Sequence, residues 1–229
     1  MLLNQQGMES ILHVYCRDRN RMALQGDMLA AYGLGIQNLI VVCSEDIANC
    51  DHQDAKTVND LDELGLISAI RSLEQGVDLA GLELNGNPSF VVGCTMAQCA
   101  DEATLERELE ATRKKVEAGA GFVVTPAVYD LNLFSAFMDR AKGLGVPIIA
   151  TVFLLKSVGS ARYIANTEPA SGLSEELIRR IRKASDREME CLRVAGDTAA
   201  ALKELAQGVR FVTLGWEHRL PAILDYAGL

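Results

Sequence analysis

Short apolar runs alternate along the chain with longer stretches in which apolar residues recur at helical spacing. The runs are rich in Val and Ile and cover residues 11–16, 38–43, 90–94, 122–128, 148–154 and 211–214. Continuous apolar runs of this length are typical of strands that are covered on both faces, as in parallel sheets. The pattern therefore predicts six strands of a parallel sheet.

The stretches between the runs predict amphipathic helices. Residues 101–119 and 131–143 each carry apolar side chains on one face at spacings of three and four. The face of the second stretch is made by Leu133, Phe134, Phe137, Met138 and Ala141. A further helix is expected from Ser174 onward, where Ser174 and Leu177 stand in the places of half a capping box.

Four glycines, Gly35, Gly119, Gly145 and Gly208, stand one to three residues before predicted strands. A left-handed glycine cap that leads into a buried strand is typical of repeated βα units. The chain is therefore expected to form one domain over residues 1–229, either a doubly wound sheet or a (β/α)8 barrel. Six strands do not close an eight-stranded barrel, so a strand escapes the pattern or the first βα units are absent. Both folds place their chemistry at the carboxyl ends of the strands.

Composition narrows the function classes. The 229 residues include 22 Lys and Arg against 31 Asp and Glu, a net charge of −9, which disfavours a nucleic-acid binder because phosphates need clustered cations. No apolar run reaches the roughly 18 residues of a membrane span, so a cytoplasmic protein is expected. The six cysteines contain no CxxC pair and are expected to be free thiols.

Polar residues at the predicted strand ends are the candidates for function. They are His13, Arg17, Asp18, Arg19, Cys43, Ser44, Glu45, Asp46, Thr95, Cys99, Thr125, Tyr129 and Asp130. Together with Glu108, Lys114 and Lys115 in the helix before the fourth predicted strand, this mixture suits a phosphate-bearing ligand better than a metal. The same residues have simpler interpretations: His13 as a packed strand residue, residues 17–21 as a solvated loop with local ion pairs, and residues 45–46 as helix-capping or loop acids.

Two other kinds of site remain open. His52 with Asp51 and Asp54 could ligate a metal, although this spacing has no second cluster to complete it. Cysteines at residues 43, 50, 94 and 99 could form a thiol site or act as small buried apolar residues. The sequence contains no GxSxG, no Walker loop and no GxGxxG after a strand.

The chain resembles a known family at these same residues. Residues 13–21, 24–29, 33–38, 51–52, 60–62 and 114–120, with Thr125 and Asp130, are similar to the methylenetetrahydrofolate reductases, flavin-dependent (β/α)8 enzymes of one-carbon metabolism. In that family two βα units precede the strand that holds His13. The resemblance therefore implies an N-terminally truncated TIM (β/α)8-type barrel of six βα units.

The resemblance also implies a site. The residues that match FAD-contacting positions are His13, Ser44, Glu45, Asp60, Glu108, Lys114 and Lys115. Glu45 stands where the family has an acid near the flavin ring, which makes it the candidate catalytic residue, and Lys115 suits phosphate or ribityl oxygens. Thr125 and Tyr129 match substrate-binding positions. The resemblance implies NADH or NADPH as the electron donor and implies no metal.

Two departures from the family pattern define the alternatives. The family's catalytic carboxylate comes from its first strand, and no residue before Ile11 supplies it. Pro126 stands where the family has a pterin-binding glutamine, and proline offers neither a side-chain amide nor a backbone N–H.

We therefore expect a reductase that converts methylenetetrahydrofolate to methyltetrahydrofolate, in tetrahydrofolate interconversion and methionine biosynthesis. The first alternative is a partner-dependent flavin- or folate-binding subunit, in which a second copy or a partner chain covers the open side of the barrel. The second is a metal- or cobamide-linked methyltransferase that uses Cys94 and Cys99.

Overall fold

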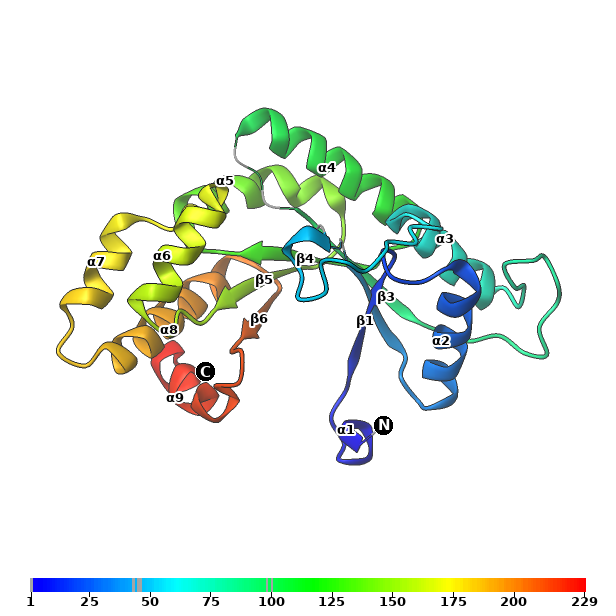
Figure 1. Cartoon of the computed structure of the whole chain (residues 1–229), viewed down its shortest axis with the longest axis horizontal. Coiled ribbons are helices and arrows are strands. Elements are labelled where there is room, and N and C mark those ends of the chain that lie inside the picture. The colour runs from blue at the N-terminus through cyan, green and yellow to red at the C-terminus, as the bar shows by residue number, and fades with distance from the viewer. Residues whose placement is uncertain (1, 43, 45–46, 98, 100) are drawn as a thin grey trace. The chain divides into compact units, whose positions relative to one another are not determined.

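The computed structural model describes residues 2–42, 44, 47–97, 99 and 101–229. In chain order its elements are α1 (Leu2–Gln5), β1 (Ile11–Tyr15), α2 (Arg21–Gly33), β2 (Asn38–Val42), α3 (Glu63–Glu74), β3 (Val91–Thr95), α4 (Glu102–Glu117), β4 (Phe122–Ala127), α5 (Leu131–Ala141), β5 (Ile148–Phe153), α6 (Val158–Thr167), α7 (Glu175–Lys183), α8 (Arg187–Leu205), β6 (Gly208–Val212) and α9 (Leu220–Ala227), with short 3₁₀ turns at Ile47–Asn49, Lys142–Leu144, Pro169–Ser171 and Glu217–Arg219 (Figure 1). In the part of the chain that these residues cover, no helix has both the length and the apolar character that a bilayer crossing requires.

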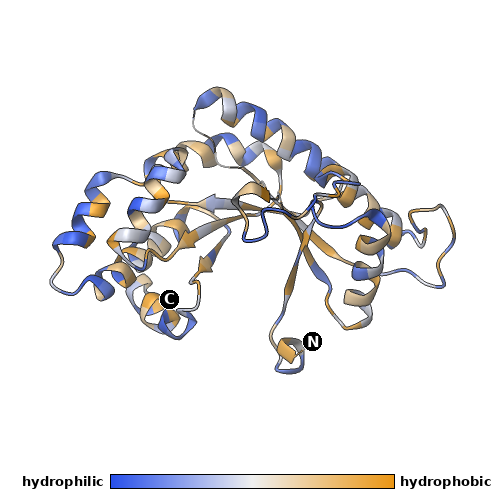
Figure 2. Cartoon of the chain, viewed as in Figure 1, coloured by the Kyte–Doolittle hydropathy of each residue, from blue (hydrophilic) through white to orange (hydrophobic). Residues whose placement is uncertain are grey.

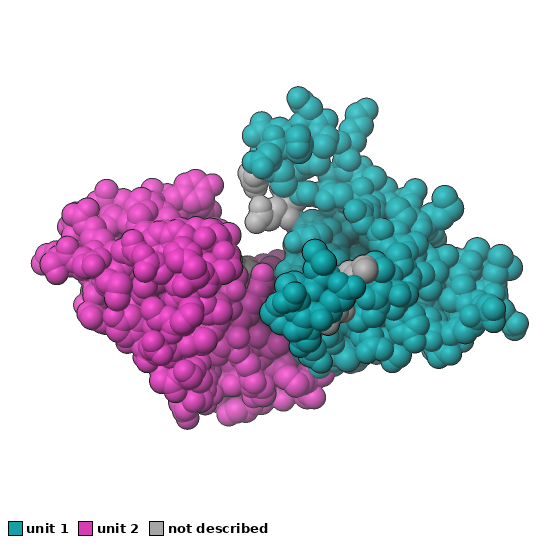
Figure 3. All heavy atoms as spheres, turned by 90° about the horizontal axis from the view of Figure 1, so that it is seen from below, with its two compact units in different colours: residues 1–95, 110–123 teal, residues 96–109, 124–229 magenta. Residues whose placement is uncertain are grey.

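The chain divides into two compact units, coloured separately in Figure 3. Unit 1 comprises residues 1–95 and 110–123, and unit 2 comprises residues 96–109 and 124–229. Helix α4 and strand β4 each contribute residues to both units. A single domain over residues 1–229 stays a prediction.

The strands follow the order β1-β2-β3-β4-β5-β6, which is also their order along the chain. Strand β2 pairs in parallel with β1 and β3, and β5 pairs in parallel with β6. A doubly wound sheet reverses its direction of winding at a switch point, whereas this order advances to the next neighbour at every step. The six predicted strands are confirmed, and their order is that of successive βα units of a (β/α)8-type fold.

Unit 1 has its core between the strands and the helices that follow them. The side chains of Leu39 and Val41 in β2 are fully buried, as are Leu66, Ile70 and Leu73 of α3, which packs on β2. Burying each such side chain stabilises the fold by about 1.5–3 kcal/mol. In Figure 2 the strands of this unit are mostly orange, whereas its helices carry both colours, as helices with one buried face must.

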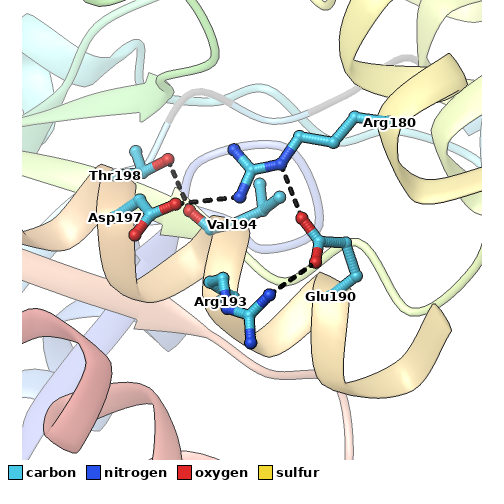
Figure 4. Close-up of polar contacts among 6 residues, drawn as sticks. All are labelled: Arg180, Glu190, Arg193, Val194, Asp197 and Thr198. Atoms are coloured by element: carbon cyan, nitrogen blue, oxygen red, sulfur yellow. Dashed lines mark hydrogen bonds and ion pairs between the residues drawn. The ribbon is translucent and has the colours of Figure 1, made fainter. Parts of the chain in front are cut away.

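Unit 2 is organised around the long helix α8. It packs on β5 and β6 and against α5, α7 and α9. Two ion pairs join it to α7, in which Arg180 contacts Glu190 at 2.6 Å and Asp197 at 3.0 Å (Figure 4). Within α8, Arg193 contacts the same Glu190 at 3.1 Å. Exposed pairs of this kind contribute little stability, so the apolar face of α8 carries the packing.

The predicted glycine joints are confirmed at three positions and wrong at one. Gly35, Gly119 and Gly145 have left-handed backbones, with φ of 80°, 124° and 70°. Gly208 is instead the first residue of β6, and Ala206 in extended conformation ends α8. Strand β6 begins before the predicted run 211–214. The prediction started too late because Arg210 interrupts the apolar pattern of the strand.

Candidate functional site

The carboxyl ends of β1, β2 and β3 meet at one edge of unit 1. Tyr15 at the end of β1 is in register with Val42 at the end of β2, and Val41 is in register with Cys94 of β3. Residues that directly follow these strands therefore gather at one place, which is where parallel α/β folds hold their chemistry.

His13 lies within β1, in one cross-strand row with Ile40 and Gly93. Its ring centroid is 6.3 Å from that of Tyr15, two residues along the same face of the strand. The His13 side chain is half-buried. The flavin contact implied for His13 stays a prediction.

Ser44 lies two residues beyond β2. Its hydroxyl oxygen is buried and makes no hydrogen bond to any residue that the structure describes. A buried hydroxyl without a partner is costly, and a ligand group at this point would satisfy it. Cys43 and Glu45, its neighbours in the predicted site, lie outside the described residues.

Lys115, in the last turn of α4, reaches the end of β3. Its ammonium nitrogen donates a hydrogen bond to the carbonyl oxygen of Thr95 at 3.0 Å and forms an ion pair with Glu63, in the first turn of α3. Lys114 is exposed on the same helix. The cation expected to meet phosphate is therefore present at the strand ends, and a carboxylate accompanies it.

Asp60 and the arginines after β1 form the ion pairs of the loop region. Asp60 accepts hydrogen bonds from the backbone N–H of Arg21 at 2.9 Å and from its guanidinium, which lowers the pKa of the Asp60 carboxyl. Arg17 contacts Asp18 at 2.6 Å and donates to the sulfur of Cys50 at 3.0 Å. The interpretation of residues 17–21 as a loop with local ion pairs agrees with these contacts.

Glu108, by contrast, belongs to unit 2. Its carboxylate accepts a hydrogen bond from the backbone N–H of Ala97 at 2.9 Å, which closes the loop between β3 and α4. A flavin contact by Glu108 stays a prediction, since unit 1 holds His13, Ser44, Asp60, Lys114 and Lys115.

Unit 2 contains a cavity of about 440 Å³ beyond the end of β4. Thr125 and Tyr129, the two predicted substrate residues, both line it. Much of the wall is apolar and comes from Met96, Leu105, Pro126, Val128, Leu133, Phe134 and Phe137. A cavity of this kind suits a ring system of low charge.

Most polar groups on the cavity wall are already engaged. Asp130 caps α5 by accepting hydrogen bonds from the backbone N–H groups of Asn132 and Leu133. Arg140 forms ion pairs with Glu102 and Glu106. The Thr125 hydroxyl donates a hydrogen bond to the carbonyl oxygen of Pro126 at 2.9 Å. Burial raises the pKa of the Tyr129 phenol, with the carboxylate of Glu168 adding to the rise. The Tyr129 hydroxyl is therefore a neutral donor at physiological pH.

The other open interpretations find less support. Among the described residues no three His, Cys, Asp or Glu side chains come together as a metal site. The described cysteines form no disulfide with one another, and Cys16, Cys94 and Cys191 are buried. Cys94 belongs to unit 1 and Cys99 to unit 2, where burial and then Glu108 raise the pKa of the Cys99 thiol and disfavour the reactive thiolate.

Sequence reasoning missed two parts of this site. Glu63 carried no signal, because its role depends on Lys115, which is distant in sequence. Arg140 and the cavity were missed too, although the apolar face predicted for residues 131–143 contained Leu133, Phe134 and Phe137. The pattern predicted only the apolar face of an amphipathic helix, and in the structure these three side chains line a cavity.

Comparison with known proteins places this geometry in context. The chain is 22% identical over 244 residues to Methylenetetrahydrofolate reductase 2 of Schizosaccharomyces pombe, covering 100% of this chain and 37% of that protein. Among solved structures it is similar to tryptophan synthase subunit alpha from Legionella pneumophila str. Paris, with 12% identity, a TM-score of 0.44 and coverage of 99% of this chain and 91% of that one. It is also similar to a long-chain alkane monooxygenase, with 11% identity, a TM-score of 0.45 and coverage of 97% and 68%.

A family model described as Methylenetetrahydrofolate reductase matches residues 1–228. Because the match extends over almost the whole sequence, the chain belongs to the methylenetetrahydrofolate reductase family.

Proposed function

We propose that the chain is a flavin-dependent oxidoreductase that reduces methylenetetrahydrofolate to methyltetrahydrofolate, with NADH or NADPH as electron donor. The observation that carries the proposal is the Lys115–Thr95 contact at the end of β3, in a sheet whose strand β1 holds His13 and whose strand β2 ends two residues before Ser44. The described cysteines form no disulfide with one another, which supports a cytoplasmic location.

The residues of unit 1 fit FAD in part. The buried hydroxyl of Ser44, which has no partner among the described residues, and the half-buried side chain of His13 offer hydrogen bonds to the edge of a flavin ring. Lys115 and Lys114 offer positive charge to the phosphates, and Asp60 would accept from the ribose hydroxyls. Bound FAD would supply the two-electron chemistry, while these residues bind and orient it.

The cavity of unit 2 would hold the ring of the folate. Its largely apolar wall suits the ring, and the Tyr129 hydroxyl can donate a hydrogen bond to a ring nitrogen or carbonyl. Pro126 lies on the wall where the family has its glutamine, so amide recognition of the pterin is not available at that point. Shape and the phenol would have to supply the specificity.

The first test is the visible absorption of the purified chain before and after FAD is added and the excess removed. We expect a retained flavin band that bleaches with NADH or NADPH. The double variant His13→Ala/Lys115→Met should bind FAD at least tenfold more weakly, because it removes a ring contact and a phosphate contact.

The matched control is His218→Ala/Lys142→Met, which removes the same residue types from exposed positions of unit 2. It should leave FAD affinity unchanged. A colourless wild-type protein would contradict the flavin function, whereas equal affinity in the two double variants would contradict only the site.

A second candidate function is a partner-dependent flavin- or folate-binding subunit. Its support is a group of exposed apolar side chains on one face of the unit 1 sheet, Ile11 and Tyr15 of β1 and Val91 of β3. A second copy or a partner chain would cover them. Reductase activity of the chain alone, measured as a monomer, would contradict this alternative.

A further inference from the structure

The contact between Lys115 and Glu63 is the least exposed ion pair found among the described residues of unit 1. The two side chains keep only 12% and 20% of their exposure. Atom Oε2 of Glu63 is buried and accepts no well-directed hydrogen bond from a described residue, so the ammonium compensates its burial by charge. Salt screens a pair of this kind much less than it screens exposed pairs.

Two further groups hold this pair in place. The Lys115 ammonium also donates to the carbonyl oxygen of Thr95, which fixes it at the end of β3. Glu63 lies in the first turn of α3, where the helix dipole attracts a carboxylate, and Asp62 caps the same helix by accepting from the backbone N–H of Gly65 at 2.7 Å. Glu63 is therefore held beside the ammonium by its own helix.

The pair cancels much of the charge that an anionic ligand would meet at the strand ends. A phosphate that approaches Lys115 is attracted by the ammonium and repelled by the adjacent carboxylate. Arg17 and Arg21, two further cations of unit 1, contact Asp18 and Asp60. Those two carboxylates are more exposed than Glu63, so among these three described acids Glu63 is the least screened by solvent.

We propose that Glu63 is a positioning residue that sets the anion affinity of Lys115. It keeps the ammonium at the end of β3 and limits how tightly a pyrophosphate-bearing ligand binds there. This inference rests on the proposed function in so far as FAD is that ligand.

The test is Glu63→Gln, which keeps the shape of the side chain and removes its charge. We expect FAD to bind about tenfold more tightly than to the wild type, and riboflavin, which lacks phosphate, to bind with unchanged affinity. The variant without ligand should melt at a lower temperature, because the Lys115 ammonium loses its partner, and FAD should raise its melting temperature by more than that of the wild type. A merely structural role for Glu63 would lower stability and FAD affinity together.

Two controls isolate the pair. Glu110→Gln removes the same charge from unit 1 at the exposed pair with Arg113 and should change FAD affinity less than twofold. In a Lys115→Met background, Glu63→Gln should no longer tighten FAD binding, since its effect acts through the ammonium. An equal gain with and without Lys115 would overturn the proposal.

Failure of the inference and failure of the proposed function give different results. Inorganic pyrophosphate is the second probe, and Glu63→Gln should tighten its binding also. Tighter pyrophosphate binding by a chain that binds no FAD would support the inference and contradict the flavin function. FAD binding that is equal in wild type and Glu63→Gln would overturn the inference and leave the flavin function standing.

If Glu63→Gln does not fold, Glu63→Asp takes its place. Its shorter side chain loosens the pair without removing the carboxylate, and should tighten FAD and pyrophosphate binding about twofold to threefold. Unchanged or weaker binding in that variant would overturn the proposal.

Discussion

The two units use their charged residues in opposite ways. In unit 1 the cation Lys115 is mostly buried beside a mostly buried carboxylate, at the strand ends where ligand contacts are expected. In unit 2 the cation on the cavity wall, Arg140, is 36% exposed, and its partners Glu102 and Glu106 are 80% and 58% exposed. We therefore expect ligand binding at the strand ends of unit 1 to depend on the balance of charges, and ligand binding in the cavity of unit 2 to depend on its apolar shape.

The largest effect that tests this contrast is the loss of each cation. Lys115→Met leaves the Glu63 carboxylate buried without its partner and should lower the free energy of unfolding by about 3 kcal/mol. Arg140→Met removes only an exposed pair and should cost less than about 1 kcal/mol. Urea unfolding of both variants measures their free energies of unfolding. Equal losses in the two variants would contradict the difference between the buried pair of unit 1 and the exposed pairs of unit 2.

The next effect concerns a close approach in unit 1. Gly93 stands in the same row as His13, and a Cβ added there would overlap the ring of Phe122. Gly93→Ala should lower the free energy of unfolding by about 2 kcal/mol and weaken FAD binding, because the ring must move on the face that carries His13.

Gly196→Ala is the comparison in unit 2. A Cβ at this position of α8 would overlap Tyr226 in α9, so a loss of similar size is expected. FAD affinity should stay as in the wild type, because unit 1 holds His13, Ser44, Lys114 and Lys115. If Gly196→Ala weakens FAD binding as much as Gly93→Ala, the assignment of the flavin residues to unit 1 alone is contradicted.

The fold was predictable because its signals are local. A continuous run of apolar residues identified β2 and β5 to within a residue at either end, since both faces of those strands pack. The predicted start of β6 lay too far along the sequence, because all residues of this strand are only half-buried and Arg210 breaks the apolar run. Strand order was not predictable from periodicity, which left the doubly wound sheet open until the pairing was known.

The site was predictable only where a residue type is diagnostic by itself or by family resemblance. Lys115 and Tyr129 were found in this way. The acidic partners of these two residues come from segments far away in sequence: Glu63 pairs with Lys115, and Glu168 adds to the raised pKa of Tyr129. Periodicity reports which face of an element is apolar, and it does not report whether that face meets a core or a cavity.

A smaller effect tests whether the Asp130 carboxylate on the cavity wall is used to cap α5. Asp130 accepts hydrogen bonds from Asn132 N–H at 2.8 Å and from Leu133 N–H at 3.0 Å, so Asp130→Ala should cost about 1 kcal/mol. Asp139→Ala, at an exposed position of the same helix, is the control and should cost less than about 0.5 kcal/mol. Equal losses would mean that the Asp130 carboxylate is available to a ligand, which would make the cavity resemble the strand ends of unit 1.

The smallest effect is expected for Tyr129, and it is visible only in alkali. Burial raises the pKa of this phenol above its usual value, so the folded chain keeps the proton at a pH where the unfolded chain releases it. The stability linked to Tyr129 is therefore fully present below the unfolded pKa of about 10 and is lost as the pH rises toward the folded pKa. Tyr129→Phe should leave stability at pH 7 almost unchanged, reduce its fall above pH of about 10, and remove the latest step from the tyrosinate absorbance titration. A variant whose titration curve differs from that of the wild type near pH 10 would show that Tyr129 is solvated, and the phenol would then not be a buried neutral donor of the cavity.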